Sequence, residues 1–209
     1  MNDERLIIIG AGGHGKVVAD IAYLCGYKVI IFLDSNESLI GKKIGYRSHV
    51  VCGTPLDIDQ FNGDVFVAIG DSHTRRKLLD FYSFEKNRNV VSLMHPNAFV
   101  SEGALIEDGV VVMPGAVINT DTTVGSGSII NTCSSVDHDC FIDEDCHIAP
   151  GAHICGGVKT GRGCWIGAGS TIINNLEIAS NVYIGAGAVV LNNIHETGTY
   201  VGVPALKIK

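Results

Sequence analysis

His138 lies between two acidic residues, in the sequence Asp137-His138-Asp139. A carboxylate beside an imidazole favours its charged form and makes the ring a stronger base. A ring with a pKa near neutrality is suited to take a proton from an attacking nucleophile. His138 is therefore a candidate general base, and the plain alternative is a polar residue exposed on a solvated face. The spacing leaves open which of the two carboxylates pairs with the ring.

Cysteine and histidine residues are frequent between positions 133 and 155, which suggests a zinc site as an alternative. The candidate ligands are Cys133, His138, Cys140, Cys146, His147, His153 and Cys155. They contain no paired C-x-x-C, and the repeat described below directs Cys140 and Cys146 inward but His138 outward. Because no four ligands converge, as tetrahedral zinc requires, we expect no metal site.

A second group of residues that could bind a ligand lies near the start of the chain. Gly10, Gly12 and Gly15 fit G-x-G-x-x-G between an apolar run and a segment of helical spacing. Such glycines let the backbone approach a phosphate, and the helix N-terminus attracts negative charge. His14 lies inside this turn, and Asp34 ends the next apolar run, where a carboxylate can accept from a ribose hydroxyl. The alternative is a tight turn that binds no ligand.

The elements around this turn alternate between strands and helices. Apolar runs predict strands over Arg5–Gly10, Lys28–Leu33, Asp64–Ile69 and Val90–Leu93. Helical spacing predicts helices over Gly13–Cys25 and Ser72–Phe84. Ser72 is the expected cap of the second helix. This order predicts a small βαβ domain with a parallel sheet. About 95 residues hold only half of a dinucleotide-binding fold, so a mononucleotide fits better than NAD and an oxidoreductase is disfavoured.

The remaining half of the chain repeats every six residues. From Val100 to Val190 every sixth residue is aliphatic, except Thr160. Three residues after each aliphatic position stands mostly Gly, Asn or Asp, which tolerate a positive φ and mark turns. Each hexad is therefore a short strand and a corner, and three hexads close a triangular coil whose strands stack ~4.8 Å apart. The pattern predicts a left-handed parallel β-helix.

The period also predicts which side chains lie beside His138. It directs His138 outward, and the same position one coil later, 18 residues on, is Gly156. A glycine there leaves room for a substrate beside the histidine, and its N–H is a candidate donor to an oxyanion. Cys146 and Cys164 are also one coil apart, and we interpret both as small hydrophobic residues inside the coil.

Composition excludes several classes of function. The net charge of -7 argues against nucleic acid as the main partner. The apolar stretches are too short to span a bilayer, so we expect no membrane insertion. The first residues are acidic where a signal peptide is basic, which indicates a cytoplasmic protein with reduced cysteines. We expect two domains, an α/β domain over residues 1–95 and the β-helix with its tail over 96–209.

Four segments together resemble a known family. These are GAGGHGKVV in the βαβ domain, then NTCSSVDHDC and HIAPGAHICGGV within the repeats, and YVGVPA near the end. Over essentially the whole chain they resemble the sugar O/N-acyltransferases of the sialic-acid O-acetyltransferase family. The likeness is greatest to bacterial enzymes that N-acetylate nucleotide-linked 4-amino-4,6-dideoxy sugars.

The resemblance implies a role for each matching residue. It makes His138 the catalytic base and Asp139 the acidic neighbour that increases its basicity. It implies acetyl-CoA contacts from His147 and from the main chain of Gly156 and Ala168. It implies nucleotide-sugar contacts from Gly12, Gly13, His14, Asp34, Ser35 and Gly70.

The expected activity is transfer of acetyl from acetyl-CoA to the amine of a nucleotide-linked amino sugar, such as a UDP-4-amino-4,6-dideoxy sugar. The product would serve surface glycan or glycoprotein synthesis, and the transfer would be direct, without an acyl-enzyme. The family resemblance implies a homotrimer with active sites between subunits, and the three-sided prism has side surfaces suited to such packing. O-acetylation of sialic acid or another sugar hydroxyl is the alternative enzyme, and a non-catalytic scaffold is the alternative of another class. The sugar, the nucleotide base and the acyl length stay open.

Overall fold

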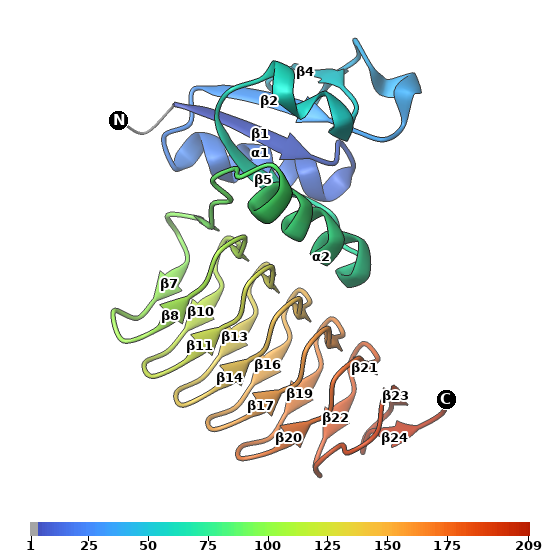
Figure 1. Cartoon of the computed structure of the whole chain (residues 1–209). Helices are drawn as coiled ribbons and strands as arrows, with labels where there is room; N and C mark the ends of the chain where they lie inside the picture. The colour runs from blue at the N-terminus through green and yellow to red at the C-terminus, as the bar shows by residue number, and fades with distance from the viewer. Residues whose placement is uncertain (1–3) are drawn as a thin grey trace. The chain divides into compact units, whose positions relative to one another are not determined.

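A computed structural model describes residues 4–209 of the chain, and these divide into two compact units, 4–95 and 96–209 (Figure 1). The first unit contains a five-stranded sheet with the strand order β3-β4-β2-β1-β5. Its strands are β1 (Arg5–Ile9), β2 (Val29–Leu33), β3 (Lys43–Ile44), β4 (His49–Gly53) and β5 (Asp64–Val67). Only β3 runs antiparallel to its neighbour.

Helices connect the parallel strands of this unit. They are α1 (Gly13–Leu24) and α2 (Ser72–Asp80), and shorter helical turns cover Glu37–Leu39, Pro55–Gln60 and Phe81–Glu85. The unit ends with the short strand β6 (Leu93–Met94). The central strand β1 is buried along almost its whole length, as expected for a parallel sheet covered on both faces.

The βαβ prediction is confirmed, with differences in detail. Asp71, not Ser72, caps α2, because its side-chain oxygen accepts from the Thr74 N–H at 2.8 Å. The expected fourth strand is reduced to a single bridge from Val90 to Val65, followed by β6. The β3–β4 hairpin was not predicted, because its strands are short and lack an apolar run.

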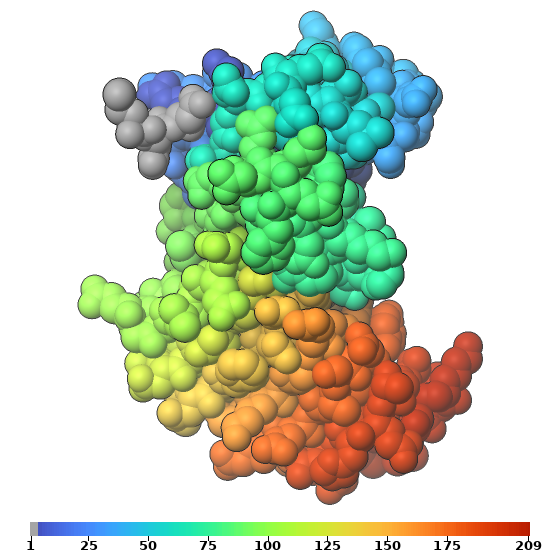
Figure 2. Space-filling view, in the orientation of Figure 1, coloured from blue at the N-terminus to red at the C-terminus, as the bar shows by residue number. Residues whose placement is uncertain are grey.

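The second unit is the predicted left-handed β-helix, and its strands form three faces (Figure 1). In the space-filling view its residues follow one another in order along the unit, from green through yellow to red (Figure 2). The β7 face consists of β7 (Phe99–Val100), β10 (Val117–Ile118), β13 (Ser135–Val136), β16 (His153–Ile154), β19 (Thr171–Ile172) and β22 (Val189–Val190). The β8 face consists of β8 (Leu105–Ile106), β11 (Thr123–Val124), β14 (Phe141–Ile142), β17 (Lys159–Thr160) and β20 (Glu177–Ile178). The β9 face includes, within this unit, β9 (Val111–Val112), β12 (Ile129–Ile130), β15 (His147–Ile148), β18 (Trp165–Ile166), β21 (Val182–Ile184), β23 (Gly198–Val201) and β24 (Leu206–Lys207).

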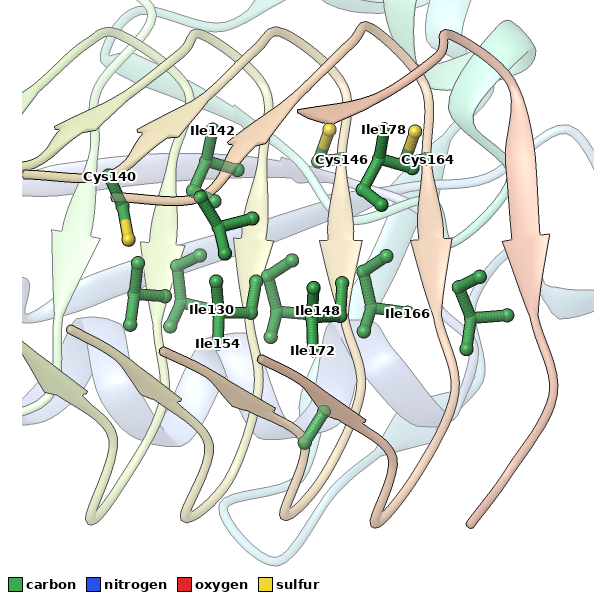
Figure 3. Packing of buried hydrophobic residues seen from close by; sticks show 14 of the residues in the cluster. Ile130, Cys140, Ile142, Cys146, Ile148, Ile154, Cys164, Ile166, Ile172 and Ile178 are labelled. Carbon is green, nitrogen blue, oxygen red and sulfur yellow. The ribbon is translucent and has the colours of Figure 1, made fainter. Parts of the chain in front are cut away.

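The repeat sets the packing inside the coil. The sixth-residue positions from Val112 to Val190 are all buried, and they stack along the axis of the prism (Figure 3). The exception, Thr160, is buried as well, and its hydroxyl lies 3.5 Å from the thiol of Cys146. A polar residue is therefore tolerated at this one position because its hydroxyl has a partner.

The small residues next to the corners also point inward. Several of their hydroxyl and thiol groups donate to the carbonyl 15 residues further along the chain. These pairs are Thr122 with Asp137, Ser128 with Asp143, Cys140 with Cys155, Cys146 with Gly161 and Cys164 with Ala179. The three cysteines are buried and free, as their positions in the repeat predicted.

Candidate active site

Asp139 occupies a corner of the coil, and its backbone has a φ of 58°. In an extended strand, successive side chains point to opposite faces. The left-handed conformation at the corner instead turns the Asp139 carboxylate back toward the preceding residue. Its Oδ2 lies 2.7 Å from Nδ1 of His138, and the two side chains are 58% and 66% exposed.

Asp137 supports the same corner from the other side. Its Oδ1 accepts from the His138 backbone N–H at 2.9 Å and from the Asn119 amide at 2.8 Å. The Thr122 hydroxyl donates to the Asp137 carbonyl at 2.6 Å. The carboxylate on the ring is therefore that of Asp139, and the Asp137 carboxylate holds the backbone.

Gly156 lies directly against the imidazole of His138. A Cβ on Gly156 would be 2.7 Å from both Cε1 and Nε2 of the ring. The His138 ring therefore fills the space directly over Gly156, and room for a substrate beside the ring stays a prediction. The Gly156 N–H has no hydrogen-bond acceptor within the described part of the chain.

The surroundings of His138 make the ring more basic. The hydrogen bond that the His138 ring donates to Asp139 is the largest cause that raises the pKa of His138, and the negative charge of Asp137 adds to it. Hydrogen bonds from the His138 N–H and from Asn119 in turn lower the pKa of Asp137, so this carboxylate stays ionised. With Nδ1 donating to Asp139, Nε2 is the nitrogen that carries the free lone pair.

Asp139→Asn should move the acid limb of the pH profile of kcat/KM to lower pH. The base works unprotonated, so the rate rises as the pH passes the pKa of His138, and the substitution removes the largest cause that raises this pKa. The rate at high pH should also fall, because a weaker base takes the proton less readily. Initial rates across the acid and neutral range measure both effects.

Asp121→Asn is the matched control, because Asp121 occupies the equivalent corner one coil earlier, with a φ of 57°. Its profile should follow that of the wild type. An acid limb that stays in place in Asp139→Asn would show that the carboxylate does not tune the base.

His147 and Ala168 lie elsewhere on the prism. His147 points outward from the β9 face, where it is 9% exposed, 4.1 Å from the ring of Trp165 and hydrogen-bonded to the Asn131 amide at 3.0 Å. Ala168 is exposed at the corner between the β9 and β7 faces, which we call the Ala168 edge. His138, Asp139 and Gly156 occupy the corner between the β7 and β8 faces, which we call the base edge.

The predicted site residues of the coil therefore form two groups on two edges. The β7 face separates these edges, because the chain runs from the base edge through the β8 and β9 faces to the Ala168 edge. The structure brings His138, Asp139 and Gly156 together but does not bring His147 or Ala168 to them.

The predicted nucleotide-sugar residues gather at the carboxyl ends of β1, β2 and β5. Gly12 and Gly13 open α1, and nothing lies within 4 Å of where their Cβ atoms would be. Gly15 has a different role, because a Cβ there would be 2.0 Å from the Gly10 carbonyl oxygen. Gly15, the third glycine of the motif, thus lets the helix pack against the turn, and Gly12 and Gly13 leave an open helix N-terminus.

Asp34 is tied to the glycine turn. Its Oδ2 accepts from the Ala11 N–H at 2.7 Å, and its Oδ1 accepts from the Asn36 N–H at 2.8 Å. The neighbouring Ser35 is exposed. The Asp34 carboxylate thus organises the turn, and a ribose hydroxyl would share oxygens that already accept backbone hydrogen bonds.

His14 is neutral at neutral pH. Burial, and to a lesser degree the charge of Arg75, lower the pKa of His14 to about 4. Its Nε2 is shielded from solvent and has no hydrogen-bond partner among residues 4–209. A polar atom in this state is costly unless a ligand pairs with it.

Arg75 was not predicted from the sequence. It is 1% exposed, and its Nη1 donates to the carbonyls of Ile69 and Gly70 at 2.9 and 2.8 Å. In sequence it resembles any cation on the solvated face of a helix, next to Arg76 and Lys77. Its only signal was its position one turn into the helix that follows a strand and Gly70.

Metal clusters and membrane-spanning helices are both absent from the part of the chain that the structure describes. Residues 4–209 contain no group of three or more His, Cys, Asp or Glu side chains able to hold a metal ion. The same residues include no helix with both the length and the hydropathy of a membrane span.

Comparison with known proteins identifies relatives over the whole chain. Residues 5–81 match the PglD N-terminal domain, and residues 157–192 match the bacterial transferase hexapeptide model of six repeats. The acetyltransferase domain of PglB from Neisseria gonorrhoeae, solved with acetyl coenzyme A, is 36% identical, with a TM-score of 0.93 and 100% of both chains covered. PerB from Caulobacter crescentus, solved with CoA and GDP-perosamine, is 34% identical, with a TM-score of 0.87 and 98% of this chain and 97% of PerB covered.

A third solved structure, WeeI from Acinetobacter baumannii, is 25% identical, with a TM-score of 0.88 over 97% of this chain and 99% of its own. The matches confirm both the resemblance and the fold inferred from the sequence motifs. The chain belongs to the hexapeptide-repeat sugar O/N-acyltransferases that carry a PglD N-terminal domain.

Proposed function

We propose that the protein transfers the acetyl group of acetyl-CoA to the amine of a nucleotide-linked amino sugar. The observation that carries this proposal is the His138–Asp139 pair, whose ring has a raised pKa and lies against Gly156. Relatives solved with acetyl coenzyme A and with CoA and GDP-perosamine support both substrates. The N-terminal unit would bind the nucleotide part, and the coil would supply the base.

In the proposed mechanism, the sugar amine attacks the thioester carbonyl while Nε2 of His138 takes a proton from the amine nitrogen. The new imidazolium is stabilised by Asp139 through Nδ1. The carbon–sulfur bond of the tetrahedral intermediate then breaks, and the proton passes from Nε2 to the departing thiolate to give CoA. The Gly156 N–H is the proposed donor to the oxyanion. No acyl-enzyme forms, so the remaining work is the alignment of two bound substrates.

A trimer would reunite the two groups of coil residues. If three prisms turn their β7 faces to a three-fold axis, the base edge of one protomer meets the Ala168 edge of the next. The outward residues of the β7 face carry no Asp, Glu, Lys or Arg; they are Phe99, Val117, Ser135, His153, Thr171 and Val189. The β8 face instead carries the exposed pair Lys159 and Glu177. Depletion of charge is typical of the core of a subunit interface. The outward hexad residues of the β9 face are uncharged too, namely Val111, Ile129, His147, Trp165 and Tyr183. The arrangement is favoured because the β7 face is the one that lies between the base edge and the Ala168 edge.

Two experiments test these proposals. A panel of nucleotide-linked amino sugars, including UDP-linked 4-amino-4,6-dideoxy sugars and GDP-perosamine, is incubated with acetyl-CoA while thiol release is followed. Release with one of these amines supports the proposal, and release only with a sialic acid or another sugar hydroxyl would replace it with O-acetylation. Light scattering should give a trimer at micromolar concentration, and a monomer would contradict a shared site.

We further propose a cytoplasmic location and a product used in surface glycan or glycoprotein synthesis.

A further inference from the structure

Arg75 is a buried cation that holds the loop between β5 and α2. A guanidinium that is 1% exposed is costly unless its N–H groups are paired. Its Nη1 donates to two consecutive carbonyls, those of Ile69 and Gly70. The contact therefore fixes the direction of two adjacent peptide groups at the carboxyl end of β5.

The direction of these carbonyls determines where the neighbouring N–H groups point. In a trans peptide, the C=O of one residue and the N–H of the next point in opposite directions. With the Ile69 and Gly70 carbonyls turned to Arg75, the N–H groups of Gly70 and Asp71 point away from it. Neither N–H has an acceptor within the described residues, and nothing lies within 4 Å of where a Gly70 Cβ would be. Adjacent N–H groups that point to one side form an anion-binding concavity.

This loop is a direct neighbour of the glycine turn. A Cβ on Gly10 would be 2.8 Å from the Ile69 side chain and 2.9 Å from the Ala68 carbonyl oxygen. The open N-terminus of α1 and the N–H groups after β5 thus lie at adjacent strand ends, because β1 pairs with β5. His14 is neutral and adds no charge here, and the Asp71 carboxylate is turned to the Thr74 N–H. The buried positive charge that can attract an anion here is that of Arg75.

We propose that Arg75 is a positioning residue for the nucleotide sugar: it turns the Ile69 and Gly70 carbonyls inward so that the N–H groups of Gly70 and Asp71 bind a phosphate. This inference rests on the proposed function, since it requires a nucleotide ligand at this edge of the sheet. Arg75 touches no substrate in this role and acts through the loop.

Direct binding to the full-length protein tests the role of Arg75 without the transfer reaction. Calorimetry with UDP, GDP, dTDP and acetyl-CoA is carried out on the wild type, Arg75→Gln, Arg75→Lys and Arg76→Gln. In Arg75→Gln the Kd of the nucleoside diphosphate should rise at least tenfold, and that of acetyl-CoA should not change. Arg75→Lys should recover part of the affinity, because an ammonium keeps the charge but not the fork of the guanidinium.

Two further measurements distinguish a positioning role of Arg75 from a general loss of structure. The His14 imidazole should titrate at higher pH in Arg75→Gln, followed by NMR, because one of the two causes that lower its pKa is removed. Arg76→Gln, which loses a surface pair with Asp80, should bind both ligands like the wild type.

The outcomes distinguish the two proposals. A wild type that binds none of UDP, GDP and dTDP overturns the proposed function and this inference with it. A wild type that binds, together with a folded Arg75→Gln of unchanged affinity, overturns only the role of Arg75. If Arg75→Gln does not fold, Arg75→Lys decides, and wild-type affinity in that variant contradicts the need for a guanidinium at this position.

Discussion

His138→Ala should lower kcat by about 10²–10⁴-fold, the usual contribution of a general base, while acetyl-CoA binding stays unchanged. The ring is exposed and its side-chain hydrogen bond is to the exposed Asp139, so its removal leaves the core of the coil intact. The sugar amine then lacks an acceptor for its proton as it attacks the thioester. Steady-state rates with the best acceptor of the sugar panel and calorimetry with acetyl-CoA measure the two effects.

His195→Ala serves as the matched control, since His195 is another exposed histidine of the same unit and lies outside both edges of the proposed site. Its rate and its melting temperature should equal those of the wild type. If kcat of His138→Ala stays within a few-fold of the wild-type value, His138 is not the general base.

Gly156→Ala should lower kcat by about 10²-fold, the order of loss expected when a catalytic group is displaced by about 1 Å. The added methyl group would lie 2.7 Å from the His138 ring, closer than a real contact allows. Gly156 is not among the residues with a positive φ, so alanine suits its backbone. The His138 ring is exposed and can move away from the methyl group. We therefore expect the substitution to displace the base and lower kcat without lowering the stability of the fold.

The melting temperature distinguishes this explanation from damage to the coil. It should stay close to that of the wild type in Gly156→Ala, and Ser180→Ala, on the third edge of the prism, should keep both rate and stability. A Gly156→Ala enzyme with full activity would mean that His138 need not lie against this glycine. A large fall in melting temperature would mean that the methyl group strains the coil.

The six-residue period of the sequence was enough to predict most features of the coil. It predicted the buried aliphatic series, the inward cysteines, the outward direction of His138 and the register that stacks His138 on Gly156. These features follow from the repeat because each hexad adds one strand and one corner, and neighbours in space are a fixed 18 residues apart. The same register did not reveal that the ring itself fills the space over Gly156.

In the N-terminal unit, prediction was less complete. The apolar runs predicted the strands that carry the glycine turn, Asp34 and Gly70, because a buried strand must be apolar along its length. The β3–β4 hairpin had no such run. The burial of Arg75 could not be predicted either, because a charged residue on a short helix looks the same in sequence whether it faces solvent or a loop carbonyl.

The sequence by itself determined the two kinds of architecture, the face on which each coil residue lies and the short list of chemical groups. Only the tertiary structure decided how those groups are paired. The choice of Asp139 over Asp137 depends on a left-handed corner that turns one side chain back, which residue types allow but do not impose. The neutral state of His14 depends on burial and on a cation far away in the sequence. Both are properties of the folded environment, because desolvation and close contact arise only when distant segments pack together.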